Sequence, residues 1–300
     1  MPTLPKIVMT HFKNLILLAV LSWGNPLSAQ TGARNDTGQT EVYTASAVSA
    51  DPEPAGFPGQ DARYGRDAAA ADAALTKVGS GAAGFDFSKV SANGQLLMVQ
   101  NQLWARDAQG FDSGDEETGT RWSCVYDHVT GLLWEVKTHA VLPDLQDREW
   151  TYSWYSSAER PDGTANAANG GNPGGINRGE CFDKFDTEGN PDGKFCDSAG
   201  YVAAINEMGL CGLTDWRMPT LDELRSIVHY GSRWPAIDVD FFPNVPGDFG
   251  NPQNPVPNAT WTGTPARFDD SAWSVYFEFG AQINPGKTFA ASVRLVRSAP

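Results

Sequence analysis

The chain has 300 residues, and its 41% hydrophobic and 11% aromatic content is enough for a core and excludes a wholly disordered protein. Acidic residues outnumber basic ones by 36 to 22, and the formal charge is −14. Nucleic acids and other polyanions are recognised by clustered Lys and Arg. We therefore expect no nucleic-acid partner, and the charge disfavours anionic lipids and sulfated polyanions.

The N-terminus has the pattern of a secretory signal peptide over residues 1–29. Two lysines precede an apolar run at residues 15–21, and Ala29 offers a small residue for cleavage. The run is too short to span a bilayer, so we expect no transmembrane segment in the mature chain. Both Met1 and Met9 are candidate start residues. Cleavage removes two lysines and no acid, which changes the formal charge from −14 to −16. These features predict export to the periplasm, the cell surface or the extracellular space.

Four cysteines, Cys124, Cys181, Cys196 and Cys211, form an even set in an exported chain. Disulfides persist in oxidising compartments, so two structural bridges are expected. Three connectivities are open. A Cys181–Cys196 bridge would close the Gly/Asn/Asp-rich segment between them, and Cys124–Cys211 would then join the first hairpin strand to the helical region. A zinc site is the alternative, but the chain has no CxxC pair and its histidines are scattered.

The composition divides the rest of the chain into two parts. Residues 30–83 are rich in Thr, Ala, Gly, Asp and Pro, with few large apolar residues. Such a composition does not easily offset the entropy of ordering, so it predicts a flexible, disordered tether. Within it, residues 67–75 favour a short helix with little to bury. Large apolar residues return from residue 84, and we expect one domain over residues 84–300.

In this domain short strands bracket two helices and long loops, which predicts an α+β fold. Alternating or apolar runs predict strands over residues 96–99, 122–127, 132–136, 152–155, 273–279 and 292–297. The first helix is expected over residues 199–208, capped by Asp197 or Ser198. The second starts with a capping box at Thr220 and Glu223 and ends at Gly231.

Several blocks of this domain match a known pattern. The first reads D-x-x-TGL-x-W and comprises Asp127, Thr130, Gly131 and Trp134. The second reads DWR-x-PT-x-x-EL and comprises Asp215, Trp216, Arg217, Pro219 and Glu223. Shorter blocks follow at residues 242–244, 261–265, 273–277 and 293–297. Over residues 96–300 the chain thus resembles the bacterial DUF1566 family, also called the Lcl C-terminal domain after a collagen-like adhesin.

The resemblance implies a C-type-lectin-like fold, in which two helices flank a small sheet. That superfamily contains carbohydrate binders, protein-binding adhesins and formylglycine-generating oxidases, so the fold does not decide the function. The second block also has a structural explanation, in which Arg217 pairs with Asp215 or Glu223 while Trp216 packs. Many members carry Cys where this chain has Leu295, so the family's disulfide pairing does not transfer.

The sequence offers little support for catalysis. The mature chain keeps three histidines, and it contains no GxSxG or HExxH motif. The stretch R-M-P-T-x-x-E-L resembles a helix of formylglycine-generating enzymes, which bind copper through a late cysteine pair. No cysteine follows Cys211, so that chemistry lacks its ligands. We therefore predict that the chain is not an enzyme, although its many carboxylates leave a glycosidase pair open.

One acidic loop is a candidate calcium site. Asp186, Glu188, Asn190 and Asp192 place oxygen ligands at every second residue, as at the start of an EF-hand. With Glu188 as position one of that pattern, position twelve is Ala199 rather than a bidentate Glu, so no true EF-hand is present. The alternative is a solvated acidic loop, and no cofactor is required.

Aromatic residues are the remaining candidates for recognition, because they stack on sugar rings and anchor protein interfaces. The candidates are Trp150, Tyr152, Trp154, Trp234 and Trp261, although most aromatics of a small domain must fill its core. The leading hypothesis is a secreted or surface-exposed, adhesin-like recognition module that binds a glycan or an extracellular or envelope protein. The alternative is an envelope structural or assembly component without a free ligand, and the third hypothesis is an enzyme.

Overall fold

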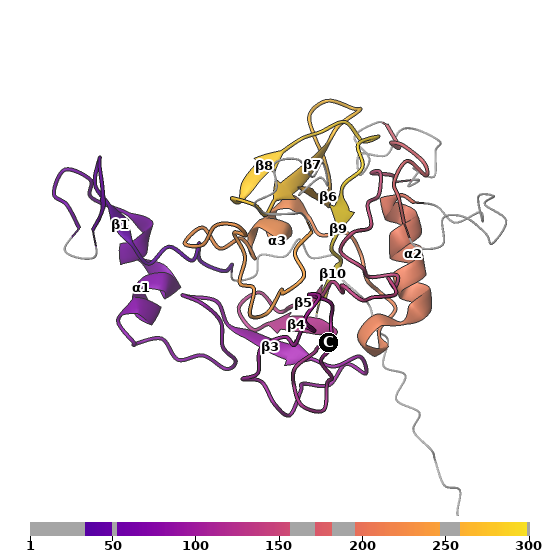
Figure 1. Cartoon of the computed structure of the whole chain (residues 1–300). Coiled ribbons are helices and arrows are strands. Elements are labelled where there is room, and N and C mark those ends of the chain that lie inside the picture. Colours follow the sequence, from indigo (N-terminus) through magenta and orange to yellow (C-terminus); the bar gives the residue numbers. More distant parts are fainter. Residues whose placement is uncertain (1–33, 50–52, 157–171, 182–195, 247–258, 299–300) are drawn as a thin grey trace, which may run out of the picture. The chain divides into compact units, whose positions relative to one another are not determined.

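A computed structural model describes residues 34–49, 53–156, 172–181, 196–246 and 259–298 (Figure 1). The predicted signal peptide lies outside these residues. The described elements are β1 (Val42–Tyr43), β2 (Val48–Ser49), the 3-10 turn η1 (Asp61–Arg63), α1 (Gly65–Ala71), β3 (Phe87–Val90), β4 (Cys124–Asp127), β5 (Leu132–Glu135), α2 (Ser198–Met208), η3 (Leu210–Gly212), α3 (Leu221–Arg225), β6 (Ala259–Pro265), β7 (Ala272–Tyr276), β8 (Ala281–Ile283), β9 (Ser292–Val293) and β10 (Val296–Ser298). The predicted α+β class is confirmed.

The strands form two four-stranded sheets and one short hairpin. The first sheet has the antiparallel order β10-β5-β4-β3, and the second has the order β8-β7-β6-β9, in which only β6 and β9 run parallel. The predicted final strand over residues 292–297 is in fact two strands, because the chain crosses from the second sheet to the first at Arg294 and Leu295. The backbone of Leu295 is held there by Glu135, whose Oε2 accepts its N–H at 2.8 Å.

Side chains on the two faces of the first sheet enter two separate cores. Val125 and Trp134 are paired across β4 and β5 and belong to one buried cluster, which α3 also contributes to through Leu224. Their neighbours Cys124 and Leu133 belong to the other cluster. Because successive side chains of a strand alternate in direction, a four-residue strand can be buried on both faces. Each hairpin strand is accordingly apolar except for its last residue, Asp127 in β4 and Glu135 in β5.

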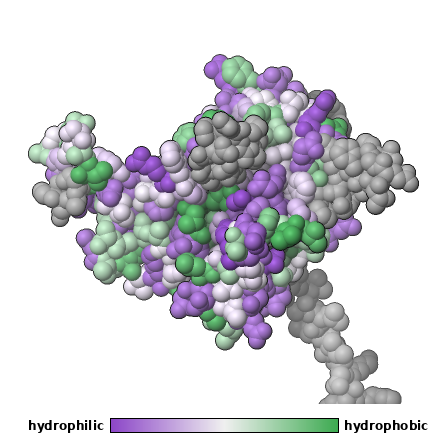
Figure 2. Space-filling model, in the orientation of Figure 1, coloured by the Kyte–Doolittle hydropathy of each residue, from purple (hydrophilic) through white to green (hydrophobic). Residues whose placement is uncertain are grey.

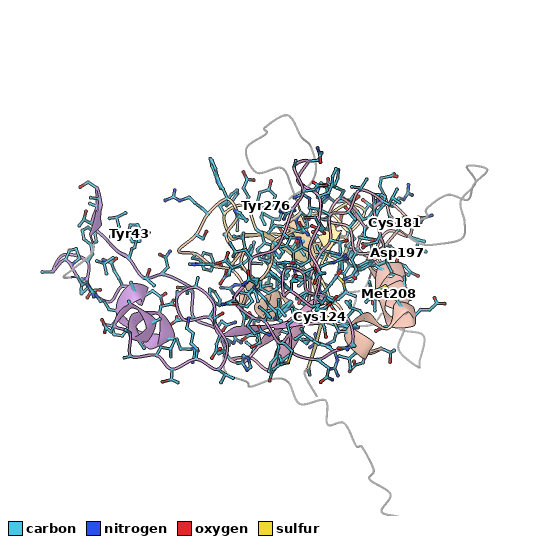
Figure 3. The ribbon with its side chains drawn as sticks, turned by 60° about the horizontal axis from the view of Figure 1, so that its bottom comes forward. Tyr43, Cys124, Cys181, Asp197, Met208 and Tyr276 are labelled. Carbon is cyan, nitrogen blue, oxygen red and sulfur yellow. A yellow bond between two sulfur atoms is a disulfide. The ribbon has the colours of Figure 1, made fainter. Side chains whose placement is uncertain are left out.

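Helix α2 forms where its caps predict it. The side chain of Asp197 accepts a hydrogen bond from the N–H of Gly200 at 2.9 Å, and Gly209 ends the helix in the left-handed conformation at a φ of 73°. Figure 3 marks the two ends of this helix at Asp197 and Met208. Its buried face carries Tyr201 and Ile205.

Helix α3 has the predicted capping box, in which Thr220 and Glu223 satisfy each other's backbone N–H groups. It packs against β6 and β7. The helix ends at Arg225 rather than near Gly231 as expected. The reason is that the N–H of His229 turns to the carbonyl of Ala236 at 3.0 Å, so the chain leaves the helical path while its apolar residues stay in the core.

The first strand of the domain is β3 and not residues 96–99 as expected. Leu96 makes only a single bridge to Val90, and Met98 is 96% exposed. The side-chain amide of Gln100 takes the place of a strand, because it accepts from the N–H of Lys89 at 2.7 Å and donates to its carbonyl at 2.9 Å. A side chain thus covers this part of the sheet edge.

The N-terminal part differs from the predicted flexible tether over residues 34–49 and 53–83. It contains β1, β2, η1 and α1, and it buries Val42, Ala62 and Asp67 at no more than 4% exposure. The carbonyl of Thr37 accepts from the N–H of Tyr230 at 2.8 Å. Hydrogen bonds between backbone groups and to carboxylates hold this segment in place. Apolar composition does not reveal such bonds, and for that reason it predicted a flexible tether.

Candidate functional site

The first signature block forms the turn between β4 and β5 and is held by Asp127. Its Oδ1 accepts the N–H of Val129 at 2.9 Å, and its Oδ2 accepts the hydroxyl of Thr130 at 2.7 Å. Gly131 has a φ of 69°, where a side chain would be strained. Burial raises the pKa of Asp127, although these hydrogen bonds oppose the rise. Trp134 is fully buried. The block therefore closes a hairpin.

The second block carries two bidentate ion pairs. Arg217 donates from Nη1 and Nη2 to the carboxylate of Glu223, each at 2.7 Å. Asp215 accepts instead from Nε and Nη2 of Arg297 on β10, at 2.6 and 2.9 Å. The hydrogen bonds that Arg217 donates to Glu223 raise the pKa of Arg217, and the hydrogen bonds that Arg297 donates to Asp215 lower the pKa of Asp215. Of the two expected partners of Arg217, Glu223 is confirmed.

The other residues of this block pack, as expected. Trp216 is 2% exposed and donates its indole N–H to the carbonyl of Leu210 at 2.9 Å. The side-chain amide of Asn206 brackets it, because Asn206 donates to its carbonyl and accepts from its N–H. The carbonyl of Pro219 accepts the N–H of Gly263 on β6 at 2.7 Å. The block thus joins α2, α3 and the second sheet.

All four cysteines form disulfides, as predicted, and the connectivity that the sequence left open is Cys124–Cys211 and Cys181–Cys196. The first spans 87 residues and ties β4 to η3, and the second spans 15 residues beside the start of α2 (Figure 3). Disulfides persist in oxidising compartments, so this pairing agrees with export. Among the described residues, no helix is long and apolar enough to cross a bilayer.

Three of the five predicted binding aromatics are core residues, and for them the prediction is wrong. Tyr152, Trp154 and Trp261 are at most 2% exposed. The indole N–H of Trp154 donates to the carbonyl of Thr262 at 2.8 Å, and that of Trp261 donates to the carbonyl of Tyr152 at 2.8 Å. Buried indoles need such acceptors, so these side chains join the second sheet to the strand-like segment around Tyr152.

Trp150 is only partly buried, and its indole N–H donates to the carbonyl of Asp144 at 2.7 Å. Trp234 is different, because 64% of it is exposed. Its φ of 60° lies in the left-handed region, which bulky residues rarely adopt. Its N–H donates to the carbonyl of Glu278 at 2.9 Å. Strained, exposed residues cluster at functional sites, so Trp234 is the strongest of the five candidates.

The hydrogen bond from Trp234 places it beside the turn between β7 and β8. Phe279 in this turn is 53% exposed, and its ring lies 5.1 Å from that of Tyr276. We call Trp234, Tyr276 and Phe279 the aromatic patch. The strand predicted over residues 273–279 ends at Tyr276, so Phe279 lies in the turn that follows β7. On the face drawn in Figure 2, hydrophobic residues form only small groups among hydrophilic ones.

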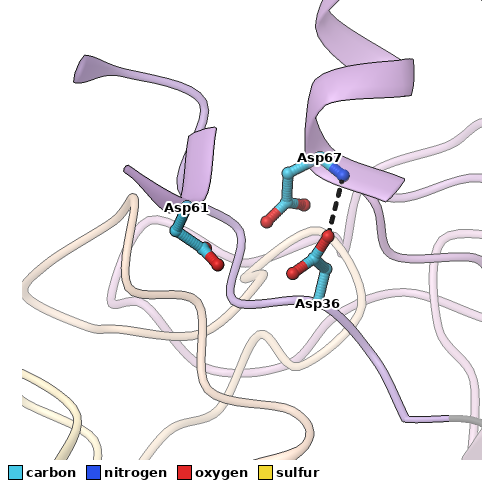
Figure 4. A group of neighbouring side chains, drawn as sticks. All are labelled: Asp36, Asp61 and Asp67. Carbon is cyan, nitrogen blue, oxygen red and sulfur yellow. Dashed lines mark hydrogen bonds between the residues drawn. The ribbon is translucent and has the colours of Figure 1, made fainter. Parts of the chain in front are cut away.

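The predicted calcium ligands Asp186, Glu188, Asn190 and Asp192 lie outside the described residues. A different group of carboxylates meets in the N-terminal part, where oxygens of Asp36, Asp61 and Asp67 lie within 4.8 Å of one another (Figure 4).

These three carboxylates have partners in the protein. Asp67 accepts from the N–H groups of Gly38 and Gly84, each at 2.7 Å, and Asp36 accepts the N–H of Asp67 at 3.1 Å. Asp61 accepts the hydroxyl of Thr37. Burial raises the pKa of Asp67, and repulsion by Asp36 and Asp61 adds to the rise. Three carboxylates this close together are able to bind a cation. The hydrogen bonds already account for the group, because they link α1 to the segment before β1.

A buried polar network surrounds Glu135. Its Oε1 lies 2.8 Å from Lys137 Nζ and accepts the hydroxyl of Tyr201, and Lys137 also donates to that hydroxyl at 2.8 Å. Arg294 donates to the carbonyl of Glu135 at 2.6 Å. Burial lowers the pKa of Lys137 and lowers that of Arg294 to about 10. All four side chains are at most 2% exposed, so the network fixes the crossing at Leu295 and is closed to ligands.

A serine and a histidine also meet on β3 and the signature turn. Ser88 Oγ lies 2.8 Å from His128 Nε2. A nucleophilic pair needs a third group that orients the histidine, and in the part of the chain that the structure describes no carboxylate bonds His128 Nδ1. Ser88 is 5% exposed and lies against Gly79. We therefore interpret this contact as a structural one that holds β3 beside the signature turn.

The fold and its two signature blocks define a disulfide-linked α+β domain with short strands. The model of the Lcl C-terminal domain matches residues 123–297, which is more than half of the chain. The chain therefore belongs to the Lcl C-terminal domain family, and the resemblance inferred from the sequence is confirmed. Comparisons with curated proteins and with solved structures return no match.

Proposed function

We propose that this chain is an exported, non-catalytic recognition module that binds a glycan through the aromatic patch around Trp234. The observation that carries the proposal is the exposure of 64% of Trp234 in a strained backbone conformation. Most tryptophans of this domain are buried, and burial alone would account for them. An exposed tryptophan has no such explanation, whereas a ligand that covers its face would supply one.

The geometry of the patch suits a sugar ring. Aromatic faces bind the apolar face of a ring, and hydrogen-bonding groups beside them fix its orientation. Arg233 precedes Trp234 and is exposed, so it offers donors to sugar hydroxyls. The backbone bond from Trp234 to Glu278 holds the backbone of Trp234 beside this turn before a ligand arrives. A pre-organised patch of this kind loses little entropy on binding.

Charge selects among glycans. The chain has a formal charge of −14, which opposes the approach of sulfated polysaccharides. Neutral glycans meet no such barrier. We also infer a C-type-lectin-like arrangement from the family resemblance, and that superfamily includes carbohydrate binders. These arguments favour a neutral glycan over a sulfated one.

The test is a glycan array probed with the purified, oxidised chain without its signal peptide, in calcium and again in chelator. Trp234→Ala is expected to lose at least about tenfold in apparent affinity, because stacked aromatics carry much of such binding energy. Phe268→Ala is the matched control, since Phe268 is 65% exposed but lies in the turn between β6 and β7. Loss of glycan binding in chelator would indicate a calcium site in the acidic loop at residues 186–192 instead of the aromatic patch. No binding by a folded chain, or equal effects of both variants, would contradict the proposal.

A further inference from the structure

Sheet edges are the starting point, because an edge strand presents unpaired N–H and C=O groups. Three of the four edges of the two main sheets are covered. Ser80 bridges to Phe87 along β3, and Arg217 bridges to Val296 on β10. Beside β9, the backbone of Ala291 bonds that of Tyr152. In contrast, β8 pairs with β7 on one side and has no strand or bridge on the other within the described ranges.

The open edge is three residues long and ends two residues before Pro285, but it carries none of the charges that blunt many natural edge strands. Natural edge strands are blunted by charged residues, bulges or proline. Strand β8 consists of Ala281, Gln282 and Ile283 and carries no charge. Ile283 is 38% exposed, and Phe279 at the preceding turn is 53% exposed. An uncharged edge flanked by exposed apolar side chains is suited to pairing with another strand.

The charges at the two ends of β8 differ, and they indicate what kind of strand pairs with this open edge. Exposed Arg233 lies at its beginning, because the next residue bonds the backbone of Glu278. Exposed Asp269 and Asp270 lie at its other end, in a turn that also carries exposed Arg267, so this end has a net charge of −1; there the carbonyl of Asp270 accepts the N–H of Lys287 at 2.7 Å. An antiparallel neighbour of the same sequence would place the arginine end of one copy beside the two aspartates of the other, twice by symmetry.

We propose that β8 is the interface through which two copies of this chain associate, by antiparallel pairing of β8 with its counterpart about a two-fold axis. The strand has no charge, so the pairing opposes no like charges within the ladder. The second sheet of one copy and the second sheet of the other, each of four strands, become one continuous sheet of eight strands. Phe279 and Ile283 of each copy lose solvent exposure. This inference does not depend on the ligand, and because the interface would cover Phe279 it predicts that association and glycan binding at the aromatic patch compete.

Association is measured by sedimentation equilibrium of the purified, oxidised chain over a wide concentration range. Wild type is expected to show a monomer–dimer equilibrium, and Ile283→Lys to weaken it at least about tenfold, because it places two lysines at the new interface. Met98→Lys is the matched control, since Met98 is 96% exposed and remote from β8 in sequence. Circular dichroism confirms that each variant is folded, and Gln282→Lys serves as a second variant.

Cysteine cross-linking identifies the contact itself. Directly opposed residues of an antiparallel pair lie close enough for a disulfide. Under mild oxidation, at least one of Ala281→Cys, Gln282→Cys and Ile283→Cys should form a covalent dimer faster than Met98→Cys. A monomer at every concentration, with cross-linking no faster than the control, would overturn the proposal. Binding of a peptide with the β8 sequence to such a monomer would assign the edge to a different partner.

Discussion

The side-chain amide of Asn35 donates a 2.6 Å hydrogen bond to Oδ2 of Asp127, which joins two residues 92 positions apart. The N-terminal segment thereby completes the carboxylate that holds the first signature turn. Removal of the segment would take away one of the two donors to this oxygen and leave the Thr130 hydroxyl, and the loss of a hydrogen bond to a buried carboxylate is costly. The segment is therefore part of the domain's stability.

This contact predicts the effect of truncation. A chain that begins at residue 84 should unfold with a free energy at least about 2 kcal/mol below that of a chain beginning at residue 34, through lost hydrogen bonds and lost burial of Val42 and Ala62. Urea denaturation followed by tryptophan fluorescence measures the difference. Equal stability of the two chains would show that residues 34–83 behave as the tether predicted from composition.

The second prediction concerns Glu223, which serves both Arg217 and the capping box of α3. Glu223→Gln keeps an acceptor for the Thr220 N–H but loses the ion pair, and should cost about 1 kcal/mol. Glu223→Ala loses both and should cost about 2 kcal/mol. Thermal unfolding of both variants tests the order. Asp222→Ala is a control, because its exposed side chain takes no part in the capping box. A Gln variant as unstable as Ala would refute the division of roles.

The third prediction is a dependence on pH. Hydrogen bonding from Arg297 lowers the pKa of Asp215 in the folded state, so the stabilisation is present above the ordinary carboxyl pKa and is lost as pH falls through the lowered value. Wild type should therefore exceed Asp215→Asn in stability at neutral pH, with a difference that shrinks in acid. Denaturation midpoints at several pH values measure this. A difference that is independent of pH would mean that the pair acts through shape alone.

Asp67 should act in the opposite direction. Burial raises its pKa in the folded state, so its ionisation costs stability as pH rises from the ordinary carboxyl value through the raised one. Asp36→Asn removes one repelling charge while its amide oxygen can still accept the N–H of Asp67. This variant should lose less stability than wild type between acid and neutral pH. The same denaturation series tests it, and an unchanged slope would contradict the coupling.

Local features of this fold were predictable, and long-range ones were not. The cap at Asp197 and the capping box at Thr220 follow from residues within one turn of the chain, so the sequence predicts them directly. The division of the last strand at Leu295 depends on Glu135, far away in the sequence. The sequence pattern that could have predicted this buried network is the presence of Glu135 and Lys137 inside the otherwise apolar run 132–137. Which tryptophans are exposed depends on how the sheets pack, and no local pattern separates Trp234 from Trp261.

The final prediction tests that distinction between the two tryptophans. Trp261→Phe removes the donor to the carbonyl of Tyr152 in the core and should cost about 1 to 3 kcal/mol. Trp234→Ala should cost less than about 0.5 kcal/mol, because the side chain is mostly in solvent. Trp234→Gly should be more stable than Trp234→Ala by up to about 1 kcal/mol, since glycine adopts the φ of 60° without strain. Urea denaturation of the three variants gives these values. A large loss in Trp234→Ala would mean that this side chain supports the fold, and it would remove the main argument for the aromatic patch as a binding surface.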